Sequence, residues 1–515
     1  MSLATRLAET PRPAGATARI AMSWLVRRLT LVAATVALAD WLFFNSFAIG
    51  ISLPLFLVAC GALVLGANPL RAERRQRYLA AVAFGIALLV LVEDVSWLSA
   101  LVAGTLVLYA ARLLVLDGSE TWTLRLLRAW GMPFGGPVLL ARDMSRVRRL
   151  APGQVAGWTQ GWRSQTWIAP IVLSLTFLVL FASANPVLAQ WLGVVDPRRL
   201  LDLASLPRTV FWLVAAGLLW PLVHVRARRM RAAPLLRAPV PAEDLSMLFG
   251  SASVLRSLVL FNALFALQSG LDAAYLWGGL DLPDGMTYAA YAHRGAYPLI
   301  LTALLAAAFV LVAMRPGGPA DTSPRIRSLV LVFVAQNVML VISSVRRTLL
   351  YTDAYGLTEL RLAALVWMAL VGVGLILIVV QIRARRSNAW LLDANALAVV
   401  ATLVLCCFAN FPYMVARYNL IHWQERGGMP TGVDLDYLIS LGPQALPAAL
   451  PILAGEEAGR FAPSQESRLR RLDRDARAAL DDANWRSWTF RDGRLKGFLD
   501  AHPLAPLPAA VGATP

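Results

Sequence analysis

Charge is scarce in this chain, and lysine is almost missing. Only 15% of the 515 residues are charged while 58% are hydrophobic, and Lys496 is the only lysine among 48 basic residues. An average soluble domain has about 25% charged residues. The low charged fraction argues against an ordinary soluble domain, whose helices would be amphipathic. The net charge of +17 would suggest nucleic acid as the partner of a soluble protein, but the distribution of that charge, described below, argues against nucleic acid.

Cysteine and histidine are also rare. None of them forms a CxxC pair or a metal-ligand spacing: Cys60, Cys406, Cys407, His224, His293, His422 and His502. The sequence therefore lacks a disulfide framework, and we expect the cysteines to be small packing residues. It also lacks a GxxxxGK(S/T) phosphate loop, an HExxH zinc motif and a GxSxG nucleophile turn. We expect no catalytic residue, no metal site and no cofactor, and whether the protein is an enzyme stays open, with the balance against it.

Long apolar runs replace the missing charge. A helix needs about 20 mostly apolar residues to cross a hydrocarbon core ~30 Å thick, because each residue rises about 1.5 Å. We expect about eleven transmembrane helices, at residues 29–47, 51–67, 78–92, 95–111, 167–184, 208–225, 254–277, 296–314, 326–345, 358–381 and 394–415. The expected fold is an all-α, polytopic transmembrane helical bundle with a small soluble helical domain at the C-terminal end.

The first apolar run has two interpretations. A basic region, a short apolar core from Leu29 to Val36 and the tripeptide Ala37–Ala39 resemble a cleavable signal peptide. The apolar sequence continues through Phe44, however, and this favours a retained first helix.

Basic residues are concentrated in alternate loops. The segments 1–28, 68–77, 112–165, 226–256, 315–327 and 382–393 together hold 29 basic and 9 acidic residues, and the remainder of the chain holds 19 basic and 22 acidic residues. Cytoplasmic loops of membrane proteins carry such an excess of Arg and Lys. The pattern therefore places the N-terminus in the cytoplasm and, with an odd number of spans, the C-terminal domain in the periplasm or outside the cell. Arg346 and Arg347 are the exception, because they fall on the outer side.

The same pattern divides the chain into four parts. They are a cytoplasmic N-terminal segment (1–28), the transmembrane domain (29–416), a small helical C-terminal domain (417–500) and an Ala/Pro-rich tail (501–515) that is expected to be disordered. Within the cytoplasmic loop 112–165, Thr121–Trp130 predicts an amphipathic helix followed by further arginines. Such a segment lies in the headgroup layer and attracts anionic lipid, at roughly 1 kcal/mol per basic residue. It either anchors the loop or forms a regulatory docking site.

The C-terminal domain has clear helical signals. Asp434–Ser440 predicts a short helix, and Pro443 can open the next one. A longer helix is predicted over 464–483, with one apolar face and two acid-first i,i+4 ion pairs: Leu469, Leu472, Ala476 and Leu480 on the face, Glu466–Arg470 and Asp473–Arg477 as the pairs.

Polar residues gather where several spans reach the expected outer membrane boundary. Asp272 lies within a span, where a charge is costly and needs a partner or water. The candidate ligand-binding residues at this boundary are Asp272, His293, Arg294, Arg346, Arg347, Tyr351, Asp353, Tyr355, Glu359, Arg361, Arg417, Tyr418 and Asn419. They either line an outward-facing polar cavity or are ordinary interfacial anchors, because Arg, Tyr and Trp prefer this depth whatever the function.

Several segments of the second half resemble a bacterial membrane family of unknown function, DUF4173, which is related to DUF4153. The segments are Tyr291–Pro298, Arg346–Arg361, Ala409–Asn419, Asp434–Pro443 and Trp485–Trp488. The resemblance implies a multi-pass protein of the bacterial inner membrane with no assigned activity. It falls on the boundary residues named above but supplies no chemistry for them.

Three functions remain open at this point. The first, favoured by the absence of catalytic motifs, is a non-catalytic envelope sensor, scaffold or accessory subunit. The second is a transporter or channel, which requires polar groups near the bilayer midplane. The third is a membrane transferase acting on a lipid-linked substrate, with an outer carboxylate as base and arginines holding phosphate. The expected partners are the lipid bilayer, anionic lipid at the Arg-rich loops and a membrane protein of unknown identity, with no nucleic acid.

Overall fold

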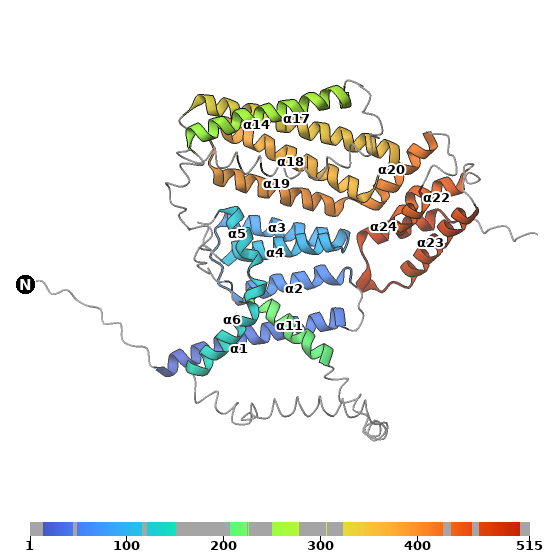
Figure 1. Cartoon of the computed structure of the whole chain (residues 1–515). Coiled ribbons are helices and arrows are strands. Elements are labelled where there is room, and N and C mark those ends of the chain that lie inside the picture. The colour runs from blue at the N-terminus through green and yellow to red at the C-terminus, as the bar shows by residue number, and fades with distance from the viewer. Residues whose placement is uncertain are drawn as a thin grey trace, which may run out of the picture. The chain divides into compact units, whose positions relative to one another are not determined.

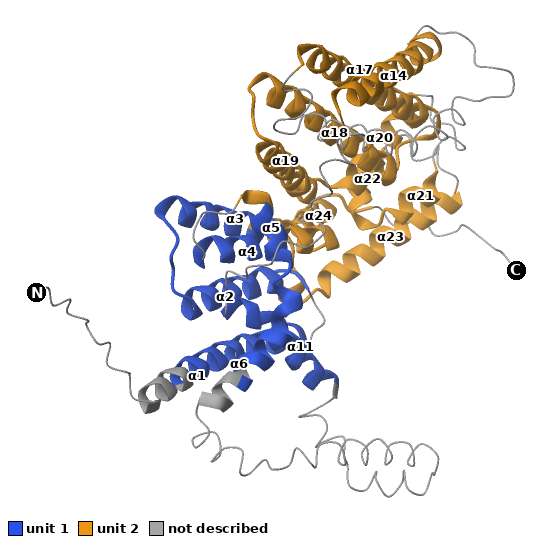
Figure 2. Ribbon diagram, turned by 60° about the vertical axis from the view of Figure 1, so that its left-hand side comes forward, with its two compact units in different colours: residues 1–88, 103–120, 124–227 blue, residues 89–102, 121–123, 228–515 orange. Residues whose placement is uncertain are grey.

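The computed structural model describes residues 14–44, 49–115, 121–150, 206–223, 225, 250–277, 305, 309, 323–425, 434–455 and 463–504. Every regular element within these ranges is a helix, which confirms the all-α class (Figure 1). The chain divides into two compact units, coloured blue and orange in Figure 2. Unit 1 is Met1–Leu88, Ala103–Glu120 and Leu124–Ala227, and unit 2 is Leu89–Val102, Thr121–Thr123 and Arg228–Pro515.

Unit 1 packs around α1 (Ala14–Ala39), α2 (Ser52–Ala67) and α11 (Leu206–Val223). Its apolar core includes Trp220, which is fully buried. The π-helix η1 (Asp40–Phe44) extends α1, and α5 (Trp122–Trp130), η2 (Pro133–Gly135) and α6 (Gly136–Leu150) follow. The Asn68 side chain lies at the end of α11, where its Nδ2 donates to the Leu222 carbonyl oxygen at 2.7 Å. Helix α5 corresponds to the amphipathic helix that the sequence predicts over 121–130.

A glycine lets α6 and α11 approach closely. A Cβ on Gly136 would lie 1.9 Å from the Gly217 carbonyl oxygen. No side chain fits at that separation, so the absence of a side chain at Gly136 is a requirement of this packing.

Helices α3 (Arg74–Glu93) and α4 (Trp97–Val115) form a hairpin whose turn belongs to unit 2. The long helices of unit 2 follow: α14 (Ser251–Asp272) with its π-helical extension η3 (Ala273–Trp277), α17 (Pro324–Tyr355), α18 (Glu359–Arg383) and α19 (Asn388–Phe408). Consecutive members of the series α14, α17, α18 and α19 pack side by side (Figure 1).

Short polar side chains set the beginnings of these helices. The side chains of Ser323, Thr358 and Ser387 each accept a hydrogen bond from the backbone N–H three residues later, at the N-termini of α17, α18 and α19. These caps satisfy N–H groups that have no partner inside a helix. The buried apolar residues between α14, α17 and α18, among them Val330 and Phe333, form the core of this layer.

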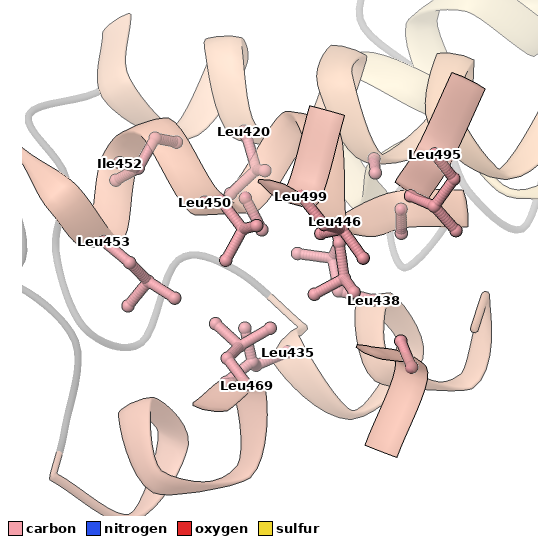
Figure 3. Close-up of a cluster of buried hydrophobic side chains, with 14 of the residues drawn as sticks. Leu420, Leu435, Leu438, Leu446, Leu450, Ile452, Leu453, Leu469, Leu495 and Leu499 are labelled. Carbon is pink, nitrogen blue, oxygen red and sulfur yellow. The ribbon is translucent and has the colours of Figure 1, made fainter. Parts of the chain in front are cut away.

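The C-terminal part of unit 2 has its own core. It contains α20 (Phe411–Glu425), α21 (Leu435–Ser440), η4 (Pro443–Ala445), α22 (Leu446–Ala454), α23 (Pro463–Asp481), η6 (Trp485–Ser487) and α24 (Phe490–Ala501). This core contains leucines of α20, α21, α22, α23 and α24. Figure 3 shows Leu420, Leu446 and Leu499 among them, and all three are almost completely buried. The predicted face of α23 is confirmed, since Leu469 and Ala476 are in this core and Leu472 and Leu480 pack against it.

Both ion pairs predicted along α23 are present. Arg470 pairs with Glu466 at 2.8 Å and Arg477 with Asp473 at 3.0 Å. The predicted short helix after Asp434 is also present, and the Asp434 side chain caps it by accepting from the Tyr437 N–H at 3.0 Å. The tail from 505 onwards lies outside the described residues.

Six of the described helices are long and apolar enough to cross a membrane: α3, α4, α14 with η3, α17, α18 and α19. The expected count of about eleven is not confirmed. The expected spans at 167–184 and, apart from isolated positions, 296–314 lie outside the described residues. Helices α2 and α11 occupy two further expected spans but are shorter apolar helices. The chain is thus consistent with a multi-pass membrane protein.

The last expected span, 394–415, ends earlier than its apolar sequence indicated. Helix α19 stops at Phe408, and α20 begins at Phe411. The cause is Asn410, whose Oδ1 accepts from the Tyr413 N–H at 3.2 Å and so starts a new helix. Its Nδ2 donates to Gln444 Oε1 at 3.0 Å, which ties this break to η4.

Candidate functional site

The first set of predicted boundary residues joins α14 to α17. Asp272, the last residue of α14, forms an ion pair with Arg347 of α17, and the two side chains are 1% and 7% exposed. Gln268, one turn earlier on α14, donates to Asp272 Oδ1 at 3.0 Å. The expectation that a charge so deep in a span needs a partner is therefore met.

Arg346, the neighbour of Arg347, faces a different environment. Its Nε donates to the Leu276 carbonyl oxygen at 3.3 Å, and its guanidinium lies 4.8 Å from the Trp277 ring centroid. Both partners belong to η3, so consecutive arginines of α17 hold the end of α14 and its π-helical extension. Arg346 itself is exposed, whereas Arg347 is buried.

The second set surrounds the junction of α17 and α18. Tyr351 and Tyr355 stack with their ring centroids 4.8 Å apart, and the Arg361 guanidinium lies 4.4 Å from the Tyr351 ring. Arg361 Nη1 also donates to the carbonyl oxygens of Tyr355 and Gly356 at the C-terminal end of α17. A cation at this position neutralises the partial negative charge of the helix end.

The third set brings α20 onto the same junction. Asn419 accepts from the Leu357 N–H at 2.6 Å and donates to the Leu357 carbonyl oxygen at 2.9 Å, so its amide closes on both polar groups of one residue. Tyr418 donates from its hydroxyl to Asp353 Oδ1 at 2.9 Å and stacks on His422 with centroids 4.1 Å apart.

A backbone bond adds the C-terminal core to this junction. The Glu359 N–H donates to the Tyr437 hydroxyl at 2.8 Å, so α21 contacts the first residue of α18. The Glu359 carboxylate is exposed. Arg417 bonds within its own helix instead, with its Nη1 donating to the Tyr413 hydroxyl at 3.4 Å.

The predicted residues therefore lie in several paired sets rather than in one cluster. His293 and Arg294 lie outside the described residues. The expected spans 326–345 and 358–381 leave Tyr351, Asp353 and Tyr355 in the loop between them, and this expectation is wrong, because all three lie on the last turns of α17. The helix continues because Arg347 is neutralised by Asp272 and because Gly356, at φ 78°, provides the stop.

A buried charge network was missed by the sequence analysis. Arg491 of α24 donates from Nη2 to the Cys407 carbonyl oxygen at 2.7 Å and from Nη1 to Asp94 Oδ2 at 3.0 Å, and its Nε lies 3.4 Å from Glu93 Oε1. Arg494 pairs with the same Glu93 carboxylate. Arg491 and Glu93 are 8% and 7% exposed, so one guanidinium joins the α3–α4 turn, the end of α19 and the start of α24.

The sequence alone predicts the position of the two acidic residues of this network but not their basic partner. Glu93 and Asp94 lie in the short turn between the expected spans 78–92 and 95–111, but their partner is distant in the sequence, at separations of 398 and 397. Burial raises the pKa of the Asp94 carboxyl above its ordinary value, the Arg491 guanidinium opposes this, and the carboxylates of Asp492 and Glu93 add to the rise.

A cavity of about 310 Å³ lies between α20 and α22. Its polar lining comes from α20, as Tyr413, Arg417 and Gln424, and its apolar lining includes Pro447 and Pro451 of α22. The boundary carboxylates of Asp272 and Asp353 do not line it.

The chemistry available to these groups is mainly that of holding elements together. Asp272 and Asp353 are bonded to Arg347 and Tyr418, and the part of the chain that the structure describes contains no group of three or more His, Cys, Asp or Glu residues able to hold a metal ion.

Polar residues in the middle of the long helices bond locally as well. Asn262 donates to the carbonyl oxygens of Leu258 and Leu329, and Asn337 donates to that of Phe333, at 2.7 to 3.2 Å. Bonds of this kind connect a side chain to its own or a neighbouring helix.

A family described as a domain of unknown function, DUF4153, matches residues 79–452, well over half of the chain. The matched region runs from α3 to α22 and includes all three sets of boundary residues. No curated protein and no solved structure matches.

Proposed function

Because this chain belongs to the DUF4153 family, whose function is unknown, we propose a function from its own residues: a non-catalytic protein of the bacterial inner membrane, acting as an envelope sensor or accessory subunit. Its C-terminal domain is the sensing part, and the long helices are the part that responds. One observation carries this proposal: polar groups at one end of the long helices form hydrogen bonds and ion pairs with the C-terminal helices.

Three separate connections support a coupling between the domain and the long helices. Arg491 bonds to the α3–α4 turn and to the end of α19, Asn419 closes on Leu357, and Tyr437 bonds to Glu359. Each connection places a C-terminal helix against the end of a candidate span. A shift in the domain would move several span ends together, because buried ion pairs and hydrogen bonds favour discrete arrangements.

The charge distribution supports an outward-facing position for the domain. Helix α18 runs from the junction at Glu359 to Arg383, and the turn that follows it contains Arg385 and Arg386. Arginine-rich turns stay in the cytoplasm. The domain bonds to the opposite end of α18, at Glu359, and so belongs on the outer side of the membrane.

The remaining assignments are also part of the proposal. The chain is a DUF4173-type member of its family, as its second half suggests. Its partners are the bilayer, anionic lipid at the cytoplasmic arginines, and a membrane protein that receives the signal.

Complementation of a deletion strain tests the proposed function, with metabolite and envelope-stress profiles as the readout. Asp353→Asn and Glu359→Gln remove the exposed carboxylates that a transferase would use as a base, and we expect both variants to restore the profile. Asn419→Ala and Arg491→Ala weaken the connections to the domain, and we expect both to fail while the protein remains in the membrane. Arg468→Ala, an exposed residue of α23, is the matched control.

Each opposite result favours another function. Failure of Asp353→Asn or Glu359→Gln at normal membrane abundance would indicate catalysis. Full rescue by both Asn419→Ala and Arg491→Ala would contradict the proposed coupling. A solute gradient that depends on the protein would indicate transport.

A further inference from the structure

The cavity between α20 and α22 lies directly beyond a candidate membrane span. Helix α20 begins at Phe411, three positions after α19 ends at Phe408. Helix α22 belongs to a short apolar segment, Pro443–Ala454. A cavity formed by these two helices therefore sits near the depth at which lipid head groups meet hydrocarbon chains.

The charge around the cavity has one sign. Among the described residues that line it, Arg417 is the only charged one, and it is exposed. The described lining residues include no carboxylate, and Arg417 Nη1 donates to the Tyr413 hydroxyl at 3.4 Å. The Gln424 amide, two turns further along α20, lines the same cavity. This arrangement favours an anion, because a guanidinium presents several donors to a phosphate or carboxylate.

The rest of the lining is apolar. Pro447, Ala448 and Pro451 of α22 share the lining with Ile421 of α20, a residue that is 40% exposed. The volume of about 310 Å³ lies at the lower end of the range of about 300–1,000 Å³ that is usual for small-molecule sites. It suits an anionic head and part of one hydrocarbon chain.

We propose that this cavity binds an anionic amphiphile, whose phosphate or carboxylate meets Arg417 and whose chain lies against α22 and Ile421. The inference deepens the proposed function, on which it rests, by giving the class of ligand that the C-terminal domain senses. Membrane phospholipid and free fatty acid share this chemistry, and the experiment separates them.

Binding is measured on the purified full-length protein in neutral detergent, with the fluorescent fatty acid 11-(dansylamino)undecanoic acid as the probe and a protein-free detergent blank. Arg417→Gln should weaken binding at least about ten-fold, since charge-assisted hydrogen bonds are the strong ones. Ile421→Trp fills the cavity from an exposed position and should abolish binding. Arg468→Gln, an exposed arginine of the same domain, should bind as the wild type does. Unchanged binding by Arg417→Gln or by Ile421→Trp overturns the proposal.

Competition identifies the source of the anion. Displacement of the probe by lysophosphatidylglycerol, but not by lysophosphatidylcholine, supports a phospholipid head group, whereas displacement by undecanoate alone supports a free carboxylate. Equal displacement by lysophosphatidylcholine overturns the anion preference. If Arg417→Gln loses binding yet fully complements the deletion strain, the binding site stands and the proposed sensing function fails.

Discussion

In this protein single arginine side chains connect several helices or helix ends to one another. A guanidinium has five donors in a planar fork, so one side chain can bond to several acceptors at once, which a lysine ammonium does less well. Arg491 reaches three elements in this way, and Arg361 bonds to two successive carbonyl oxygens at the end of α17. The near absence of lysine is thus compatible with extensive charge pairing in the interior.

Removal of Arg491 tests the buried network. Arg491→Met leaves the buried Glu93 carboxylate with Arg494 alone, and the loss of one partner of a buried pair costs about 3–5 kcal/mol. We expect a clear fall in the thermal unfolding temperature of the purified protein in detergent. Arg468→Met is the control, because Arg468 and Asp436 form an exposed pair worth at most about 1 kcal/mol. Equal stability of the two variants would contradict the assignment.

The raised pKa of Asp94 gives a pH dependence with a defined sign. In the folded protein Asp94 holds its proton at higher pH than in the unfolded chain, so its contribution to stability falls as pH rises above its ordinary pKa of 3.8. Asp94→Asn should therefore lack this fall and should be at least as stable as the wild type at pH 7. Unfolding temperatures of the two proteins, compared between pH 4 and 7, check this. If Asp94→Asn is less stable than the wild type at pH 7 and equally stable at pH 4, the predicted direction of the pH dependence is wrong.

The pair of Asp272 and Arg347 is expected to depend on both members. Asp272→Leu leaves the Arg347 guanidinium buried without its carboxylate and should cost about 3–5 kcal/mol. The double variant Asp272→Leu/Arg347→Met removes both charges and should recover most of that loss. Membrane abundance and thermal unfolding of the three proteins measure this. If the double variant is as unstable as the single one, the pairing does not explain the burial.

At the scale of elements, the apolar runs predicted which segments are helical better than they predicted where those helices end. The hairpin α3–α4 and helices α14 and α18 begin within a few residues of expectation. Helix α19 begins six residues earlier than expected, at Asn388 rather than at 394. The expected span of α17 ended at Val345, ten residues before the helix does, because two arginines follow Val345 in the sequence. Burial of one of them against Asp272, on another helix, allows the helix to continue, and sequence alone does not reveal such a long-range partner.

The candidate site was predictable to a similar degree. The sequence identified residues that share one end of the long helices, because charge alternation predicts the side of each loop. It did not identify which of them pair, nor the roles of Arg491 and Tyr437, because these depend on how the C-terminal helices fold back. The Asn410 cap was visible in the sequence as Asn-Phe-Pro but was obscured by the apolar residues around it.

Gly356 tests the junction between α17 and α18. Its φ of 78° and ψ of 167° lie in a region that is essentially limited to glycine, and a Cβ there would lie 3.1 Å from Asn419 Oδ1. Gly356→Ala should cost about 1–3 kcal/mol and loosen the hold of Asn419 on Leu357. Gly372→Ala, within α18 where a Cβ meets nothing within 4 Å, should be neutral or slightly stabilising. Protease sensitivity and thermal unfolding are measured for both variants. Equal effects of the two substitutions would contradict the claim that position 356 requires glycine.

At the scale of the whole molecule, the chain combines candidate membrane spans with a C-terminal group of shorter helices that has its own apolar core. The spans have apolar, exposed surfaces, as expected when lipid takes the place of water: Leu360 is 79% exposed and Leu405 is 70% exposed. The C-terminal domain instead has a buried core and charged helices such as α23. The proposed function depends on the domain lying on the outer side, because a sensor of the envelope must face it.

Cysteine accessibility in spheroplasts measures this side directly. Asp482→Cys places a thiol at the exposed position directly after α23, and Arg386→Cys places one in the exposed turn between α18 and α19. The wild-type chain, whose three cysteines lie in helices α2 and α19, is the blank. A membrane-impermeant maleimide should label Asp482→Cys in intact spheroplasts and Arg386→Cys only after the membrane is opened. Labelling of Arg386→Cys but not Asp482→Cys in intact spheroplasts would contradict the proposed orientation and the sensing function that depends on it.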